Sequence, residues 1–81
     1  MKIENKEIND CKSNLKKMRI TRGLTQAELS SLSGINIKSI ALYEQNPSRL
    51  SKASVDTVYS IADSLNCDIS SIINKETLNS K

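Results

Sequence analysis

An all-α fold, a compact bundle of five short helices, is the fold class that this 81-residue sequence predicts. Apolar residues recur at helical spacing, helix-capping residues precede those stretches, and Gly or Pro stands between several of them. A chain of this length has room for one small core and one domain. We expect that domain over residues 13–74, a disordered N-terminal arm over residues 1–12 and a C-terminal tail over residues 75–81.

The first helix is expected over residues 13–21, with Leu15 and Met18 facing inward and Gly23 after its end. Cys11 would join the same apolar stripe if the helix began one turn earlier. The sequence leaves the first residue of this helix open.

Two more helices are expected close together, within residues 24–44. Thr25 and Glu28 have the spacing of a capping box, in which each side chain bonds the backbone N–H of the other residue. This predicts a helix over residues 26–33. Gly34 then suits the positive φ at which many helices end.

The third helix is expected to start almost at once. Asn36 is a good N-cap, which predicts a helix over residues 37–45. The inner face of this helix pair is expected to consist of four apolar residues, Ala27, Leu29, Ile35 and Ile40. Two helices joined by a short turn that contains Gly have the geometry of a helix-turn-helix motif.

A loop and two further helices are expected in the rest of the chain. Residues 45–53 are the predicted loop, because Pro47 bars continuation of the preceding helix. Ser54 is the predicted N-cap of the fourth helix. This helix has an apolar stripe that faces the core, and the Tyr59 ring is expected to pack beside that stripe. That stripe is Val55, Val58, Ile61, Ala62 and Leu65. A last helix over residues 69–74 adds more apolar residues than one small core needs. The candidate dimer surface is therefore Ile69, Ile72, Ile73 and Leu78.

These residues resemble the Cro/repressor-like (Xre-type) helix-turn-helix domains of bacteria, their phages and mobile elements. Three stretches carry the resemblance over residues 13–73: NLKKMRITRGLTQAELSSLSG, SIALYEQ and TVYSIADSLNCDISSII. The resemblance implies a lambda-repressor-like DNA-binding domain. This chain departs from the family in two respects. No Gly follows Tyr43 and Glu44 within two residues, and the third helix is more apolar, at Ile37, Ala41 and Leu42, than recognition helices of the family usually are.

The resemblance also implies roles for individual residues. The helix over residues 36–45 would enter the major groove of DNA, where Lys38 donates to guanine and Asn36 bonds adenine or a phosphate. The implied base-contact residues are Asn36, Ile37, Lys38, Ala41 and Leu42. The implied phosphate-contact residues are Lys16, Gln26, Ser39, Arg49, Ser51 and Lys52. Arg19 and Glu44 are expected to form an ion pair between the first and third helices.

The apolar character of the third helix leaves two interpretations open. Ile37, Ala41 and Leu42 are placed to touch thymine methyl groups, which would weight recognition toward methyl contacts. The same three residues also suit a protein-binding face.

The positive charge of the chain is concentrated around this motif. Residues 11–52 contain eight basic and two acidic side chains, whereas residues 1–10 carry a net charge of −1 and residues 53–81 a net charge of −2. Within a total charge of +3, this distribution is typical of a phosphate-facing surface.

Composition argues against an enzyme and against a metal site. The chain has no His, and its two cysteines, Cys11 and Cys67, do not form a CxxC pair. A disulfide between them is disfavoured in a reducing cytosol. No apolar run approaches the length of a membrane span, and the charged start lacks a signal-peptide core, so we expect a cytoplasmic, nucleoid-associated protein. We expect no cofactor and no small-molecule ligand.

The sequence therefore predicts a protein that binds double-stranded DNA sequence-specifically and regulates transcription. Repression is the favoured mode of regulation, and a homodimer is the favoured assembly. The alternative is a protein-interaction module or antitoxin of the same fold, which would bind another regulator or a toxin.

Overall fold

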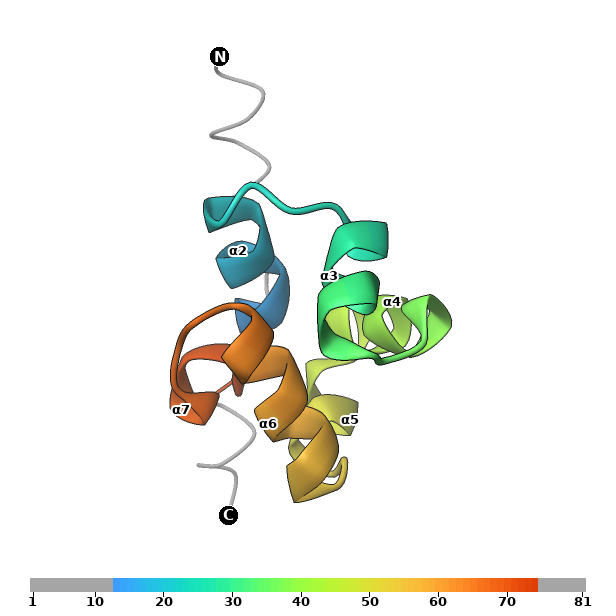
Figure 1. The fold of residues 1–81 in the computed structure, drawn as a ribbon. Helices are drawn as coiled ribbons and strands as arrows, with labels where there is room; N and C mark the ends of the chain where they lie inside the picture. The colour runs from blue at the N-terminus through green and yellow to red at the C-terminus, as the bar shows by residue number, and fades with distance from the viewer. Residues whose placement is uncertain (1–12, 75–81) are drawn as a thin grey trace.

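The computed structural model describes residues 13–74, and every regular element within them is an α-helix. The helices are α2 (Asn14–Thr21), α3 (Gln26–Ser33), α4 (Ile37–Gln45), α5 (Pro47–Ser51), α6 (Val55–Ser64) and α7 (Ile69–Ile72), as Figure 1 shows. The predicted all-α class is confirmed, with six helices in the described residues instead of five. The predicted arm and tail, with Cys11 and Leu78, lie outside the described residues.

A single apolar cluster, to which all six of these helices contribute, forms the core. α2 packs against α7, and α3 packs against α4 and α6 (Figure 1). α2 also packs against α4. Its buried members are Leu15, Leu29, Ile40, Leu50, Val58, Ile61, Ala62, Leu65, Ile72 and Ile73. The core therefore covers the inner side of the helix-turn-helix formed by α3 and α4 and leaves its outer side to solvent.

α2 and α3 begin at residues whose side chains bond the free backbone N–H groups, and α3 ends at a residue whose backbone conformation closes the helix. The Ser13 hydroxyl accepts the backbone N–H of Lys16 at 3.1 Å at the start of α2. Thr25 and Glu28 form the reciprocal capping box of α3, with N–O distances of 3.0 and 2.8 Å. Gly34 ends α3 with a φ of +76°.

A short helix, α5, replaces most of the loop that was predicted for residues 45–53. Asn46 is the C-cap of α4 and also the N-cap of α5, and Pro47 lies in the first turn of α5. Proline is well suited to this position because its missing N–H would have no helical partner there. The loop prediction was wrong because Pro47 ends one helix and starts the next. Leu50 anchors α5 in the core.

Several apolar residues are not buried or exposed as the predicted helix faces required. Ala27 and Val55 are exposed, Val55 by 74 % of its surface, because both lie in a first helical turn that no neighbouring helix covers. The Tyr59 ring is exposed instead of packed. Ile72 and Ile73, which were predicted to belong to a dimer surface, are buried in the core of their own chain. The last helix ends at Ile72 instead of residue 74.

Candidate nucleic-acid interface

The turn between α3 and α4 sets where α4 begins. The Gly34 backbone N–H donates to the Ser30 carbonyl at 2.9 Å, and the Ser30 hydroxyl donates to the Ile35 carbonyl at 2.6 Å. The side-chain oxygen of Asn36 then accepts the backbone N–H of Lys38 at 2.8 Å. These short-range bonds start α4 almost directly after α3 ends.

A buried ion pair fixes the orientation of α4 against α2 and α3. Arg19 donates from Nε to Glu44 Oε2 at 2.6 Å and from Nη2 to Glu44 Oε1 at 3.1 Å. The Arg19 Nη1 also donates to the Leu24 carbonyl, and Gln26 Nε2 donates to Glu44 Oε1 at 3.1 Å. Because Ile40 and Glu44 are buried one turn apart, the opposite side of α4 faces solvent.

The solvent-facing side of α4 carries the residues that the resemblance assigned to base contacts. Asn36, Ile37, Lys38 and Leu42 are exposed, and Ala41 is half-buried. Residues four apart on a helix are neighbours, so Lys38 lies beside Leu42 and Ile37 lies beside Ala41. The structure therefore brings these five side chains onto one continuous surface, which we call the α4 face.

Two cationic residues of the predicted phosphate set lie next to the α4 face. Arg49 and Lys52 are exposed and line an open cavity of about 510 Å³ between α4 and α5. Leu42, Tyr43 and Ser48 complete its lining. Two positive charges together with two hydroxyl groups match the hydrogen-bonding chemistry of a phosphate. We call this cavity the basic cavity.

Other predicted phosphate contacts are placed differently. The Ser51 hydroxyl donates to the Ser48 carbonyl at 2.8 Å, and Ser51 lines a separate apolar groove. Gln26 gives one amide N–H to Glu44, which leaves its second amide hydrogen for another acceptor. Ser39 is half-buried on α4, and Lys16 is half-buried on α2.

Two of the arginines counted in the basic region are bonded away from α4 and the basic cavity. Arg19 is held in the ion pair with Glu44. Arg22 donates from Nε to the Leu65 carbonyl at 2.6 Å, at the end of α6. The exposed cations on α4 and around the basic cavity are Lys38, Arg49 and Lys52.

Three polar residues at this surface were not predicted from the sequence. Tyr43 and Ser48 line the basic cavity, and Gln45 is exposed in the last turn of α4. The helical spacing of Gln45 from Lys38 and Leu42 would have placed it on the α4 face. No comparable signal existed for Ser48, because α5 itself was not predicted.

A family model described as a helix-turn-helix domain matches residues 13–78. The chain belongs to this family. The family is of the Xre/Cro-like type, which confirms the resemblance seen in the sequence. No match was found among curated proteins or among solved structures.

Helix-turn-helix domains of this family are DNA-binding domains and not enzymes. In helix-turn-helix motifs in general, the second helix is the one placed in the major groove of DNA. Here α4 occupies the position of that second helix. Residues 13–74 contain no group of three or more candidate metal ligands. None of their helices is long and apolar enough to cross a membrane.

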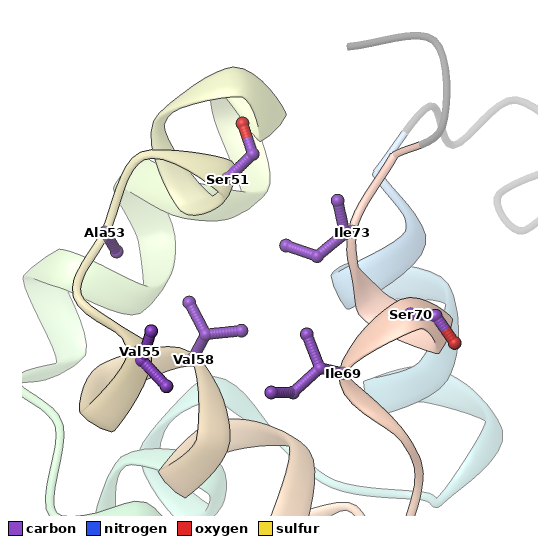
Figure 2. Close-up of a pocket in the computed structure, with 7 residues that line it drawn as sticks. All are labelled: Ser51, Ala53, Val55, Val58, Ile69, Ser70 and Ile73. Atoms are coloured by element: carbon purple, nitrogen blue, oxygen red, sulfur yellow. The ribbon is translucent and has the colours of Figure 1, made fainter. Parts of the chain in front are cut away.

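This helix-turn-helix domain has a second distinctive surface, an apolar groove of about 480 Å³ between α6 and α7. The groove is lined by Ser51, Ala53, Val55, Val58, Ile69, Ser70 and Ile73. Figure 2 shows the side chains of Val58, Ile69 and Ile73 converging on its interior. Val55 and Ile69 are exposed at the groove, and the exposed Tyr59 follows Val55 by one helical turn.

Proposed function

We propose that this helix-turn-helix protein binds double-stranded DNA sequence-specifically and regulates transcription, with α4 inserted in the major groove. The observation that carries the proposal is the solvent-facing α4 face with the basic cavity directly beside it. A duplex presents base edges in its groove and phosphates along the groove rim, so it matches both parts of this surface.

Each part of the surface has a proposed task. Lys38 donates to guanine at a base edge, and Arg49 and Lys52 hold a backbone phosphate together with the Tyr43 and Ser48 hydroxyls. Phosphate contacts set the register on the duplex and supply most of the salt-dependent affinity. The second amide hydrogen of Gln26, with Lys16 and Ser39, is proposed to contact further phosphates.

We propose repression as the mode of action, because a bound domain blocks a promoter by occupancy alone. Such a protein acts on the nucleoid in the cytoplasm. Its control is proposed to come from expression level, turnover or a protein partner instead of a small ligand. Thermal unfolding scans with metabolite mixtures test this last point, since a saturable rise in Tm would reveal a ligand.

We propose a homodimer as the functional unit, with the groove side of α6 and α7 as its interface. Val55, Tyr59 and Ile69 expose apolar surface there, and the groove offers an apolar concavity beside them. A two-fold interface must be self-complementary, and a protrusion beside a groove meets that requirement. Two α4 helices would then read half-sites about 10 base pairs apart, or a multiple of that spacing.

Selection from a random-sequence duplex library, repeated at two salt concentrations, tests the proposal. An enriched inverted repeat is expected, and its half-site spacing would measure the dimer geometry. The salt series is needed because affinity for DNA depends steeply on ionic strength. Retention without any enriched sequence would overturn sequence-specific recognition.

Two lysine variants separate base contacts from phosphate contacts. Lys38→Ala is expected to weaken binding to the selected site by about 1 to 3 kcal/mol and to relax the preference at one base pair. Lys52→Ala is expected to weaken binding to selected and scrambled duplexes alike and to reduce the salt slope by about 1. Equal losses on both duplexes for both variants would contradict these roles.

The alternative function is a protein-interaction module or antitoxin of the same fold. It would use the exposed apolar residues Ile37 and Leu42, or the groove, to bind another regulator or a toxin. Failure of DNA selection, together with loss of a co-purifying toxin or regulator in Leu42→Ala, would favour it over the DNA-binding function.

A further inference from the structure

The hydrogen-bonding capacity of the α4 face is smaller than its sequence implies. Adenine recognition by an asparagine requires the amide oxygen and the amide nitrogen together. In Asn36 the amide oxygen already accepts the backbone N–H of Lys38 at 2.8 Å, which caps α4. The cap occupies one of the two lone pairs of this oxygen and holds the Asn36 amide against the start of α4, so the amide is not free to turn both groups toward an adenine edge. Gln45 lies at the opposite end of α4, about 12 Å along the helix axis from Ile37.

Apolar side chains dominate the remaining surface near the N-terminal half of α4. Ile37 and Leu42 expose 41 % and 37 % of their surface, and the half-buried Ala41 lies beside them. Removing such surface from water is favourable only if the partner offers an apolar group in return. On the base edges of the major groove, the C5-methyl group of thymine is that group.

The charges around these apolar residues indicate which partner covers them. Leu42 lines the basic cavity with Arg49 and Lys52, and Lys38 lies on the same side of α4. Glu44, the one acidic residue of α4, is buried and paired with Arg19. A partner that presents apolar groups flanked by negative charges complements this arrangement, and duplex DNA does so.

We propose that the domain recognises its site mainly through thymine C5-methyl groups that contact Ile37 and Leu42, with Lys38 as the charged base contact. This inference rests on the proposed DNA-binding function and names the chemical group that the α4 face recognises. A site for this protein should then contain thymines at the positions that face α4. Discrimination there should depend on a methyl group and not on a hydrogen bond.

Replacement of thymine by deoxyuridine in the duplex tests the inference, because it removes the methyl group and keeps the base pair. The probe is the strongest duplex from the library selection, with one thymine replaced at a time. At each contacted position we expect binding about fourfold weaker, which corresponds to about 0.8 kcal/mol for one buried carbon group. A Kd unchanged at every position would overturn the inference while leaving DNA binding intact.

Side-chain variants link each methyl group to a residue. Leu42→Ala and Ile37→Ala are each expected to abolish the difference between thymine and deoxyuridine at one position and to keep it at the others. Leu32→Ala is the matched control, because Leu32 is 61 % exposed on α3 and is not part of the α4 face. Circular dichroism checks that the variants fold.

The outcomes separate the two proposals. If both Ile37→Ala and Leu42→Ala keep the full difference in Kd between thymine and deoxyuridine duplexes at every position, the assignment to these residues is overturned. The absence of any enriched site in the selection would overturn the proposed function, and the inference with it.

Discussion

The Arg19–Glu44 pair shows how two charges are accommodated beside a small apolar core. Removing charges from water is unfavourable unless partners replace the lost hydration. Here Glu44 accepts two bonds from Arg19 and one from Gln26, and Arg19 gives its third bond to the Leu24 carbonyl. No buried side-chain N or O atom lacks a partner in the part of the chain that the structure describes. The pair therefore links α2, α3 and α4 at one point.

Arg19→Met is expected to lower the free energy of unfolding by about 3 to 5 kcal/mol, because the Glu44 carboxylate stays buried without its counterion. Urea unfolding followed by circular dichroism measures the change. The double variant Arg19→Met/Glu44→Leu should recover most of the loss, since no charge is then stranded. A loss below about 1 kcal/mol in the single variant would mean that the pair behaves as a solvent-exposed one.

The environment of Cys67 predicts that the free energy of unfolding depends on pH in the alkaline range. Burial raises the pKa of the Cys67 thiol, Asp68 raises it further, and the Arg22 guanidinium opposes them. The unfolded chain thus loses this proton at lower pH than the folded chain does. The contribution of Cys67 to stability is full below the unfolded-state pKa and falls as pH rises through the folded-state pKa.

Thiolate absorbance during a pH titration of a Cys11→Ser variant measures this shift, because Cys67 is then the remaining thiol. Its midpoint is expected above that of the same variant unfolded in urea, and alkylation at neutral pH should be slower in the folded protein. A folded-state midpoint below the unfolded one would contradict the burial argument.

At the scale of single elements, α3 and α4 follow signals that lie within a few residues of their ends. The Thr25–Glu28 box, Gly34 and Asn36 each act on backbone groups nearby in the chain, so their effect does not depend on the rest of the fold. This is why the bounds of both helices matched the prediction. α5 was missed because its signal, Pro47, also marks the end of a helix, and because so short a helix depends on tertiary packing, here the burial of Leu50.

Gly34→Ala tests the turn between α3 and α4. Gly34 has a φ of +76°, and a Cβ there would meet no atom within 4 Å, so the expected loss comes from backbone conformation alone. We expect about 1 to 2 kcal/mol of destabilisation in thermal or urea unfolding. Gly34→Asn is the matched control and should lose less, since Asn adopts this conformation more readily. Equal stability of Gly34→Ala and wild type would contradict the assignment.

At the scale of the whole molecule, α5 separates two surfaces of different chemistry. Ser48, Arg49 and Lys52 line the basic cavity beside α4, whereas Ser51 lines the apolar groove beside α6 and α7. One surface suits a polyanion and the other suits an apolar partner. This separation is the physical basis for proposing that the domain binds DNA and a second copy of itself at the same time.

Val55→Asp tests the proposed dimer interface. Because Val55 is largely exposed, the monomer should fold normally, while the new carboxylate would be desolvated in the dimer. We expect the dimer Kd to rise by about tenfold or more in sedimentation equilibrium. Binding to an inverted repeat should weaken, whereas binding to a single half-site should not. Leu32→Asp places the same charge on α3 as a control, and an equal effect of both variants would argue against this interface.

The sequence alone determined the all-α class, the helix-turn-helix and the polar and apolar composition of α4, because caps, turns and helical periodicity act over a few residues. Tertiary structure decided which residues far apart in the chain lie in contact and which of them are buried. It buried the Arg19–Glu44 pair, which the family resemblance had implied, tied Arg22 to the Leu65 carbonyl and buried Ile72 and Ile73 in the core. It also placed the basic cavity and the apolar groove on either side of α5. These features depend on which distant residues meet, and local pattern carries no such information.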